Sequence, residues 1–287
     1  MNTTETIPND FPFHSKYAEV LGSKMHYVDE GSGDPILFLH GMPTSSYLWR
    51  NVIPWVKSSG RCIALDLIGM GQSDQPNISY QVFDHVRYIE AFIEKLGLKN
   101  ITLVMHGWGS VIGFDYAMRH ENNIKGLAFL ESHFKFGEEM NHSLPTLHLS
   151  SDLRQLKPVH AVERLLRSGT LRPLSRTELN MYLSSFSSAR NCQPVLQYMN
   201  DLFGGDSSQA VASLIKTYSQ KLMHSNLPKL MLYAVPGLNT TMDTVVWARD
   251  HINNLKLVDL GEDLHFIPET KPQLLGQHVA TWYQSLK

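Results

Sequence analysis

The chain has 287 residues, with 25 Lys or Arg against 27 Asp or Glu, so its formal net charge is only −2. This length builds one large core but not two ordinary domains with linkers, and the near-zero charge excludes the basic surface of a nucleic-acid-binding protein. The mean hydropathy of −0.19 and the short apolar runs exclude a membrane-spanning helix. We therefore expect neither nucleic acid nor a membrane as a partner.

The beginning of the chain and its cysteines indicate the compartment. The first residues, MNTTETIPNDFPF, contain neither a basic segment nor the apolar run of a signal peptide. Cys62 and Cys192 form no CxxC pair and no disulfide framework, which is typical of proteins in a reducing compartment. We expect a cytoplasmic protein.

Short apolar runs alternate with helical periodicity, the pattern of an α/β sheet. Polar and apolar residues alternate over Lys24–Asp29, which predicts a half-exposed early strand. Continuous apolar runs predict buried strands of the parallel type at Pro35–Leu39, Arg61–Leu65, Ile101–Met105, Gly126–Leu130, Lys229–Tyr233 and Leu255–Asp259. Apolar residues at helical spacing, beginning with Phe83 and Val86, predict a helix over Phe83–Leu96. A second helix is expected at Ser110–Arg119.

The alternation of strand and helix stops after about Ser132 and resumes near Pro228. The stretch between shows helical patterns at Val159–Leu166 and Arg176–Phe186 but no buried strand. We therefore expect a sheet core over residues 1–133 and 225–287, with an inserted helical cap over residues 134–224. Ligands of open α/β sheets bind beyond the carboxyl ends of the strands. A cap there would enclose a largely apolar pocket.

Four segments directly follow expected strands and should meet at that edge of the sheet: residues 40–43, 106–109, 131–133 and 264–266. We expect His40, His106 and Phe266 to line the pocket. The run Met105-His106-Gly107-Trp108-Gly109 has the form of a nucleophile elbow, a sharp strand-to-helix turn that displays one side chain. Its tip is Gly107, which displays none.

At this point the chain resembles the α/β-hydrolases, specifically the haloalkane dehalogenases and the related coelenterazine luciferases. The resemblance rests on HGMPTSSYLWRNVIP (40–54), DLIGMGQSD (66–74), HGWGSVIGFDYA (106–117), GTLRPLS (169–175), PKLMLYAVPG (228–237) and LHFIPETKP around His265. It implies an α/β-hydrolase fold, with a mostly parallel eight-stranded sheet flanked by helices and an inserted helical cap. We expect no cofactor and no metal, since the sequence has no HExxH motif.

The family uses an Asp nucleophile, a His base and a Glu or Asp that orients the His; a Trp after the nucleophile and an Asn or second Trp hold the halide. The resemblance, carried over position by position, implies that His265 is the base, Glu131 its partner and Trp108 the halide-binding Trp. The nucleophile position holds Gly107 and the position of the halide-binding Asn holds Met42. Both departures affect the chemistry.

A carboxylate must attack carbon to release halide, and Met cannot donate a hydrogen bond to the leaving anion. We therefore expect dehalogenation and Ser-type ester hydrolysis to be lost. The backbone N–H groups of Met42 and Trp108 remain at the usual oxyanion-hole positions, and a His265–Glu131 pair makes a general base. The sequence predicts non-covalent acid–base catalysis on an apolar, natural-product-like small molecule.

Several alternatives stay open at this stage. His265 could be a relict, Glu131 a solvated surface acid, and Trp108 a pocket wall rather than a halide ligand. The chain could be a pseudoenzyme that only binds a ligand, or an inactivated variant of a true dehalogenase. Two further groups, the Ser110 hydroxyl and the Asp115 carboxylate, lie too far along a helix to replace the nucleophile. Asp66 and Asp74 are expected to brace their turn.

Overall fold

The computed structural model describes residues 7–135, 157–188, 190–203 and 205–286. Its strands form one eight-stranded sheet in the order β1-β2-β4-β3-β5-β6-β7-β8. The strands are β1 (Lys16–Val20), β2 (Ser23–Glu30), β3 (Pro35–Leu39), β4 (Arg61–Leu65), β5 (Ile101–His106), β6 (Ile124–Leu130), β7 (Lys229–Pro236) and β8 (Leu255–Asp263). β2 pairs antiparallel with β1 and β4, and the remaining neighbours are parallel. The expected mostly parallel α/β sheet is confirmed.

Every expected strand is present, and β1 was not predicted. β1 buries only Ala18 and Val20, too short an apolar pattern to stand out in the sequence. The expected half-exposure of β2 is wrong, because its residues 25–28 are all buried. His26 tolerates burial there because its Nδ1 lies 2.8 Å from Asp66 Oδ2. The expected full burial of β8 is also wrong, since this strand pairs only with β7 and lies at the edge of the sheet.

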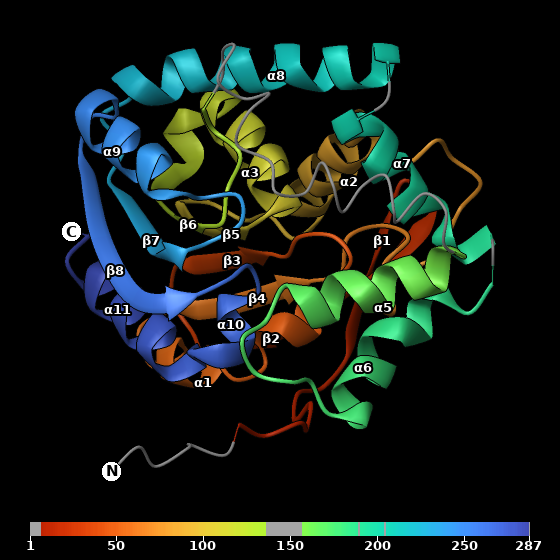
Figure 1. Cartoon of the computed structure of the whole chain (residues 1–287). Helices are drawn as coiled ribbons and strands as arrows, with labels where there is room; N and C mark the ends of the chain where they lie inside the picture. Colours follow the sequence, from red (N-terminus) through yellow and green to blue (C-terminus); the bar gives the residue numbers. More distant parts are fainter. Residues whose placement is uncertain (1–6, 136–156, 189, 204, 287) are drawn as a thin grey trace.

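Helices cover both faces of the sheet (Figure 1). α1 (Ile53–Val56) packs against α11 (Pro272–Gln284) on one face, and α2 (Val82–Lys95), α3 (Trp108–Arg119) and α9 (Met242–His251) cover the other. The short helix α10 (Ile267–Thr270) precedes α11. Phe83, expected on the buried face of α2, is 44% exposed, because it lies to one side of the face that the buried residues Val82, Val86 and Ile89 form.

Between β6 and β7 the described residues form four α-helices: α5 (Pro158–Ser168), α6 (Arg176–Leu183), α7 (Gln193–Phe203) and α8 (Gly205–His224). We call them the cap helices. α8 packs on α3 and α7, and α5 packs on α6 and α7 (Figure 1). The part of this insertion that the structure describes contains no strand, and residues 136–156 of the expected cap lie outside the described residues. The boundaries 134 and 224 stay a prediction. No helix in the described ranges combines the length and hydropathy that crossing a bilayer requires.

Candidate active site

The turn between β5 and α3 places residue 107 at the carboxyl edge of the sheet. Gly107 is the N-cap of α3, with φ 51° and ψ −124°. A Cβ built at this position would lie 3.4 Å from both Nε2 and Cε1 of His265, an ordinary van der Waals distance. A side chain here would therefore point at the imidazole of His265, and glycine leaves that space without one.

His265 and Glu131 are in contact, as the sequence predicts for a base and its partner. His265 Nδ1 lies 3.0 Å from Glu131 Oε2, and the two side chains are 12% and 0% exposed. The carboxylate accepts, so Nδ1 carries the proton and Nε2 presents its lone pair toward residue 107. The reading of Glu131 as a solvated surface acid is wrong, since its side chain is fully buried.

The loop after β7 holds the Glu131 carboxylate in place. Oε2 accepts hydrogen bonds from the backbone N–H groups of Leu238 at 3.0 Å and Asn239 at 2.8 Å, and Oε1 accepts from Thr240 N at 3.3 Å. Glu131 itself has a positive φ of 48°. Sequence reasoning missed this loop. Its only signal is Gly237, which follows the Val-Pro end of β7 with a φ of 66°.

His106 and His40 bond to the backbone of the site. His106 Nε2 donates to the carbonyl oxygen of His265 at 3.0 Å. Burial, and after it neighbouring His265, holds the pKa of His106 well below its usual range, so this ring is neutral. His40 Nδ1 donates to Gly41 O at 2.9 Å while its Nε2 accepts from Leu67 N at 2.9 Å. Both rings are fully buried, and both shape the loops around residue 107.

Aromatic rings surround the base. Phe266 packs edge-on against the ring of His265, with centroids 4.7 Å apart. Trp108 is buried and meets Tyr198 of α7 edge-on at 5.0 Å. The ring of Trp108 also lies edge-on to that of His133, with centroids 6.4 Å apart. Burial lowers the pKa of His133 to about 4. Tyr198 was missed from the sequence because a Tyr on a cap helix carries no signal of its own. Met42, in the loop after β3, is also buried.

The side chains near residue 107 that could replace a nucleophile are engaged elsewhere. Ser110 Oγ donates to Gly107 O at 2.6 Å and accepts from His133 N at 3.1 Å. Asp115 pairs with Arg119 at 2.9 Å. The prediction that neither acts as the nucleophile therefore agrees with the geometry.

The two aspartates of residues 66–74 brace the chain as predicted. Asp66 Oδ1 accepts from Ser46 N at 2.6 Å and Oδ2 from Gln72 N at 2.7 Å, and Asp74 Oδ2 accepts from Lys24 N at 2.7 Å. Across the described residues, no three His, Cys, Asp or Glu side chains gather as a metal site would require.

A cavity of about 220 Å³ lies beside the site, between the end of β6, the start of α9 and α8. Its wall combines apolar cap residues such as Val211 and Ile215 with His133 and Asn239. This cavity adjoins the loop that holds Glu131, since Asn239 N is one of the donors to that carboxylate. None of the expected pocket residues His40, His106, Trp108 and Phe266 lines this cavity, so its apolar volume lies beside the Glu131 loop and not against the base.

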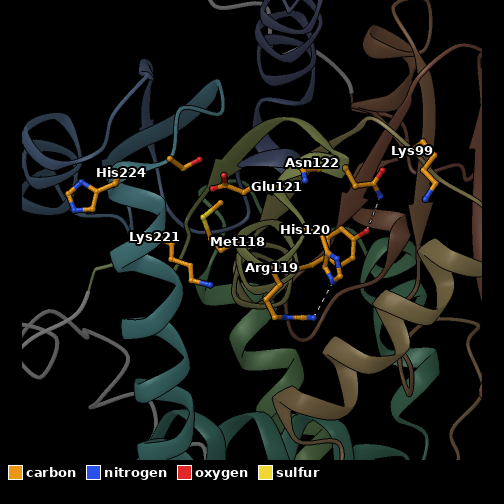
Figure 2. Close-up of a pocket in the computed structure, with 11 residues that line it drawn as sticks. Lys99, Met118, Arg119, His120, Glu121, Asn122, Lys221 and His224 are labelled. Carbon is orange, nitrogen blue, oxygen red and sulfur yellow. Dashed lines mark hydrogen bonds between the residues drawn. The ribbon is translucent and has the colours of Figure 1, made fainter.

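A larger hollow, of about 920 Å³, lies at the opposite, amino-terminal edge of the sheet (Figure 2). Lys99, Arg119, His120 and residues of the last turn of α8 line it. Two of its charged side chains are already paired, because Arg119 and His120 both contact Glu90, at 3.1 and 2.7 Å. None of the residues around Gly107 reaches this hollow, so we do not assign the chemistry to it.

Comparison with known proteins assigns the chain to a family. A family model described as the alpha/beta hydrolase fold matches residues 34–234. The chain belongs to the α/β-hydrolase family. The chain is 36% identical over 290 residues to a haloalkane dehalogenase of Sphingobium indicum, covering 96% of this chain and 97% of that protein. A haloalkane dehalogenase of Bradyrhizobium diazoefficiens is 33% identical, with 94% of each chain covered.

Haloalkane dehalogenases are also among the solved structures that match this chain. The crystal structure of the haloalkane dehalogenase DatA from Agrobacterium tumefaciens matches this structure with a TM-score of 0.88 and 29% identity, covering 96% of this chain and 97% of that one. The resemblance to haloalkane dehalogenases that the sequence motifs indicate is thus confirmed for the fold and the homologues.

Proposed function

We propose that this protein lacks the covalent nucleophile of its haloalkane dehalogenase relatives and performs non-covalent acid–base catalysis on an apolar small molecule. The observation that carries the proposal is the His265–Glu131 contact of 3.0 Å, whose free imidazole nitrogen faces Gly107. The protein keeps the base, His265, but has no nucleophilic side chain at residue 107 whose ester intermediate the base would help to hydrolyse. The dyad therefore acts on the substrate itself, or on a water molecule.

The chemistry follows from the tautomer. His265 Nε2 removes a proton from a C–H, O–H or water, and the buried Glu131 carboxylate stabilises the imidazolium that forms. The negative charge that develops on the substrate is stabilised by the backbone N–H groups of Met42 and Trp108. Trp108 begins α3, so the helix dipole there also favours an anion. Cyclisation, elimination, addition and direct hydration all use such a base and oxyanion hole.

Ring opening of 5-nitrobenzisoxazole tests the base. This apolar probe opens when a single C–H proton is removed, and the phenolate product is followed by its absorbance. We expect the wild-type protein to accelerate the reaction, and His265→Ala to lower the rate by about 100-fold or more. His251→Ala, at an exposed histidine of α9, is the matched control and keeps the wild-type rate. An unchanged rate in His265→Ala overturns the proposal.

Dehalogenation is the second candidate, favoured by the names of the relatives. It requires a nucleophile at residue 107, and the sequence has glycine there. A ligand-binding pseudoenzyme is the third: it would bind an apolar probe equally well in wild type and His265→Ala and convert it in neither. Halide release and probe turnover distinguish the three functions.

A further inference from the structure

A buried cluster of four charges lies between the cap helices and the sheet core. Its members are Arg50, Arg172, Glu178 and Glu269, which we call the Arg–Glu cluster. Arg50 follows β3 in the core and forms a two-pronged contact with Glu269 of α10, Nη1 to Oε1 at 2.5 Å and Nη2 to Oε2 at 2.8 Å. The side chains of Arg50, Glu178 and Glu269 are at most 2% exposed. Two cations and two anions make the cluster neutral, as burial requires.

Arg172 ties the cap into this cluster. It lies in the loop between α5 and α6, and its Nη2 donates to Glu178 Oε1 at 2.6 Å and to Glu269 Oε2 at 2.7 Å. Arg172 Nε also donates to the backbone carbonyl of Glu269. Burial alone would raise the pKa of Glu178, but the Arg172 guanidinium and the Ser175 amide lower it to about 2. The carboxylate is therefore charged, and Arg172 bridges two anions on opposite sides of the cap–core boundary.

The same cap loop touches the backbone of the base. The carbonyl oxygen of Gly169 accepts from His265 N at 3.0 Å and from Phe266 N at 2.8 Å. A Cβ on residue 169 would lie 2.6 Å from Cε2 of Phe266, so only glycine allows this approach. Residues 169 and 172 thus contact the two ends of the segment 265–269. Besides these contacts, the His265 backbone is held by His106 through its carbonyl.

We propose that Arg172 is a positioning residue, which acts through Glu269 and Gly169 to hold the imidazole of His265 against Glu131. The inference rests on the proposed function only in taking His265 as the base. Arg172 reaches no reacting atom. It fixes the loop that supplies the Gly169 carbonyl, and it fixes the far end of the segment that carries His265. Without Arg172, Glu269 keeps its contact with Arg50, but the loop that carries Gly169 loses its link to the segment 265–269 through Glu269.

The Nδ1 proton of His265 provides a test that needs no substrate. A proton held between imidazole and a buried carboxylate gives a low-field NMR signal, which is assigned by its loss in His265→Ala. In Arg172→Gln we expect this proton to exchange with water about tenfold faster or more, because exchange reports local opening of the contact. Arg167→Gln removes the same charge from the cap, at an exposed pair with Glu163, and should leave the exchange rate unchanged.

Arg172→Lys keeps the charge but loses the planar fork, so its exchange should also accelerate, though less. If Arg172→Gln does not fold, the exchange rate in Arg172→Lys tests the proposal instead. A wild-type exchange rate in a folded Arg172 variant overturns the proposal. Because the signal is read without turnover, a failed benzisoxazole assay leaves this result unaffected, and the two proposals fail separately.

Discussion

At the scale of single residues, position 107 combines an unfavourable backbone with space for a side chain. Its φ of 51° and ψ of −124° are rarely adopted by other residues, yet a Cβ there meets nothing closer than 3.4 Å. The turn is thus shaped to display a side chain toward His265, and glycine adopts the same turn without strain. On the proposed function, this turn keeps the backbone of a nucleophile elbow while glycine supplies no nucleophile.

Gly107→Ala should therefore lower the free energy of unfolding by about 1–3 kcal/mol, through backbone strain rather than a clash. Gly97→Ala is a matched control, because Gly97 has a φ of 61° and open space around its Cβ position, and it should also be destabilised, by about 1–2 kcal/mol. Urea unfolding of both variants measures this. Wild-type stability in Gly107→Ala would mean that the turn does not have this conformation.

Glu131 is the second residue on which the site depends. Glu131→Gln replaces one acceptor oxygen by an NH₂ group, which must face backbone donors from residues 238–240 or the His265 N–H. A buried donor left unpaired costs about 1–3 kcal/mol of stability, so we expect that loss in chemical denaturation, together with slower benzisoxazole opening. Glu163→Gln, at an exposed ion pair, should change stability by less than about 1 kcal/mol. Equal stabilities of the two variants would contradict the buried contact.

At the scale of elements, the cap helices meet the core through charges rather than apolar side chains alone, and this makes their contact sensitive to acid. The pKa of Glu178 is lowered to about 2 from its ordinary value of 4.5. Such a group contributes stability above the unfolded value, and the contribution is lost as pH falls from about 4.5 to about 2. Glu178→Gln should flatten the stability profile in that window. At neutral pH it should cost about 3–5 kcal/mol, since it breaks a buried ion network.

Urea denaturation between pH 7 and pH 3 measures the effect. Glu163→Gln should keep the wild-type slope over this range. A wild-type slope in Glu178→Gln would contradict the role given to Arg172 in holding the charged form of Glu178.

The elements also show which features a sequence can predict. Continuous apolar runs such as Pro35–Leu39 located the buried strands, because burial on both faces leaves a local signature. β1 has no such signature, and the exposure of β8 depends on its place at the sheet edge, which only the assembled topology fixes. In the site, His265 and Glu131 follow strand ends and were predictable. The loop at 238–240 and the Arg–Glu cluster were not, because their contacts join segments far apart in the chain.

At the scale of the whole molecule, the sheet brings four distant segments to one edge: the loop after β3, the β5–α3 turn, the end of β6 and the segment after β8. The fold is shared with the haloalkane dehalogenase DatA, at a TM-score of 0.88, although residue 107 is glycine in this chain. A fold of this kind keeps its geometry through changes of single residues, so the reaction is decided at the site and not by the fold.

Reaction with a primary bromoalkane tests the central claim most directly, by halide release and by the mass of the intact protein. We expect no bromide release above the buffer rate by the wild-type protein, and no alkyl adduct. Gly107→Asp combined with His265→Ala supplies a carboxylate without the base that would hydrolyse its ester, so this variant should accumulate one alkyl group. Catalytic bromide release by the wild-type protein would contradict the account and establish a dehalogenase with a nucleophile other than residue 107.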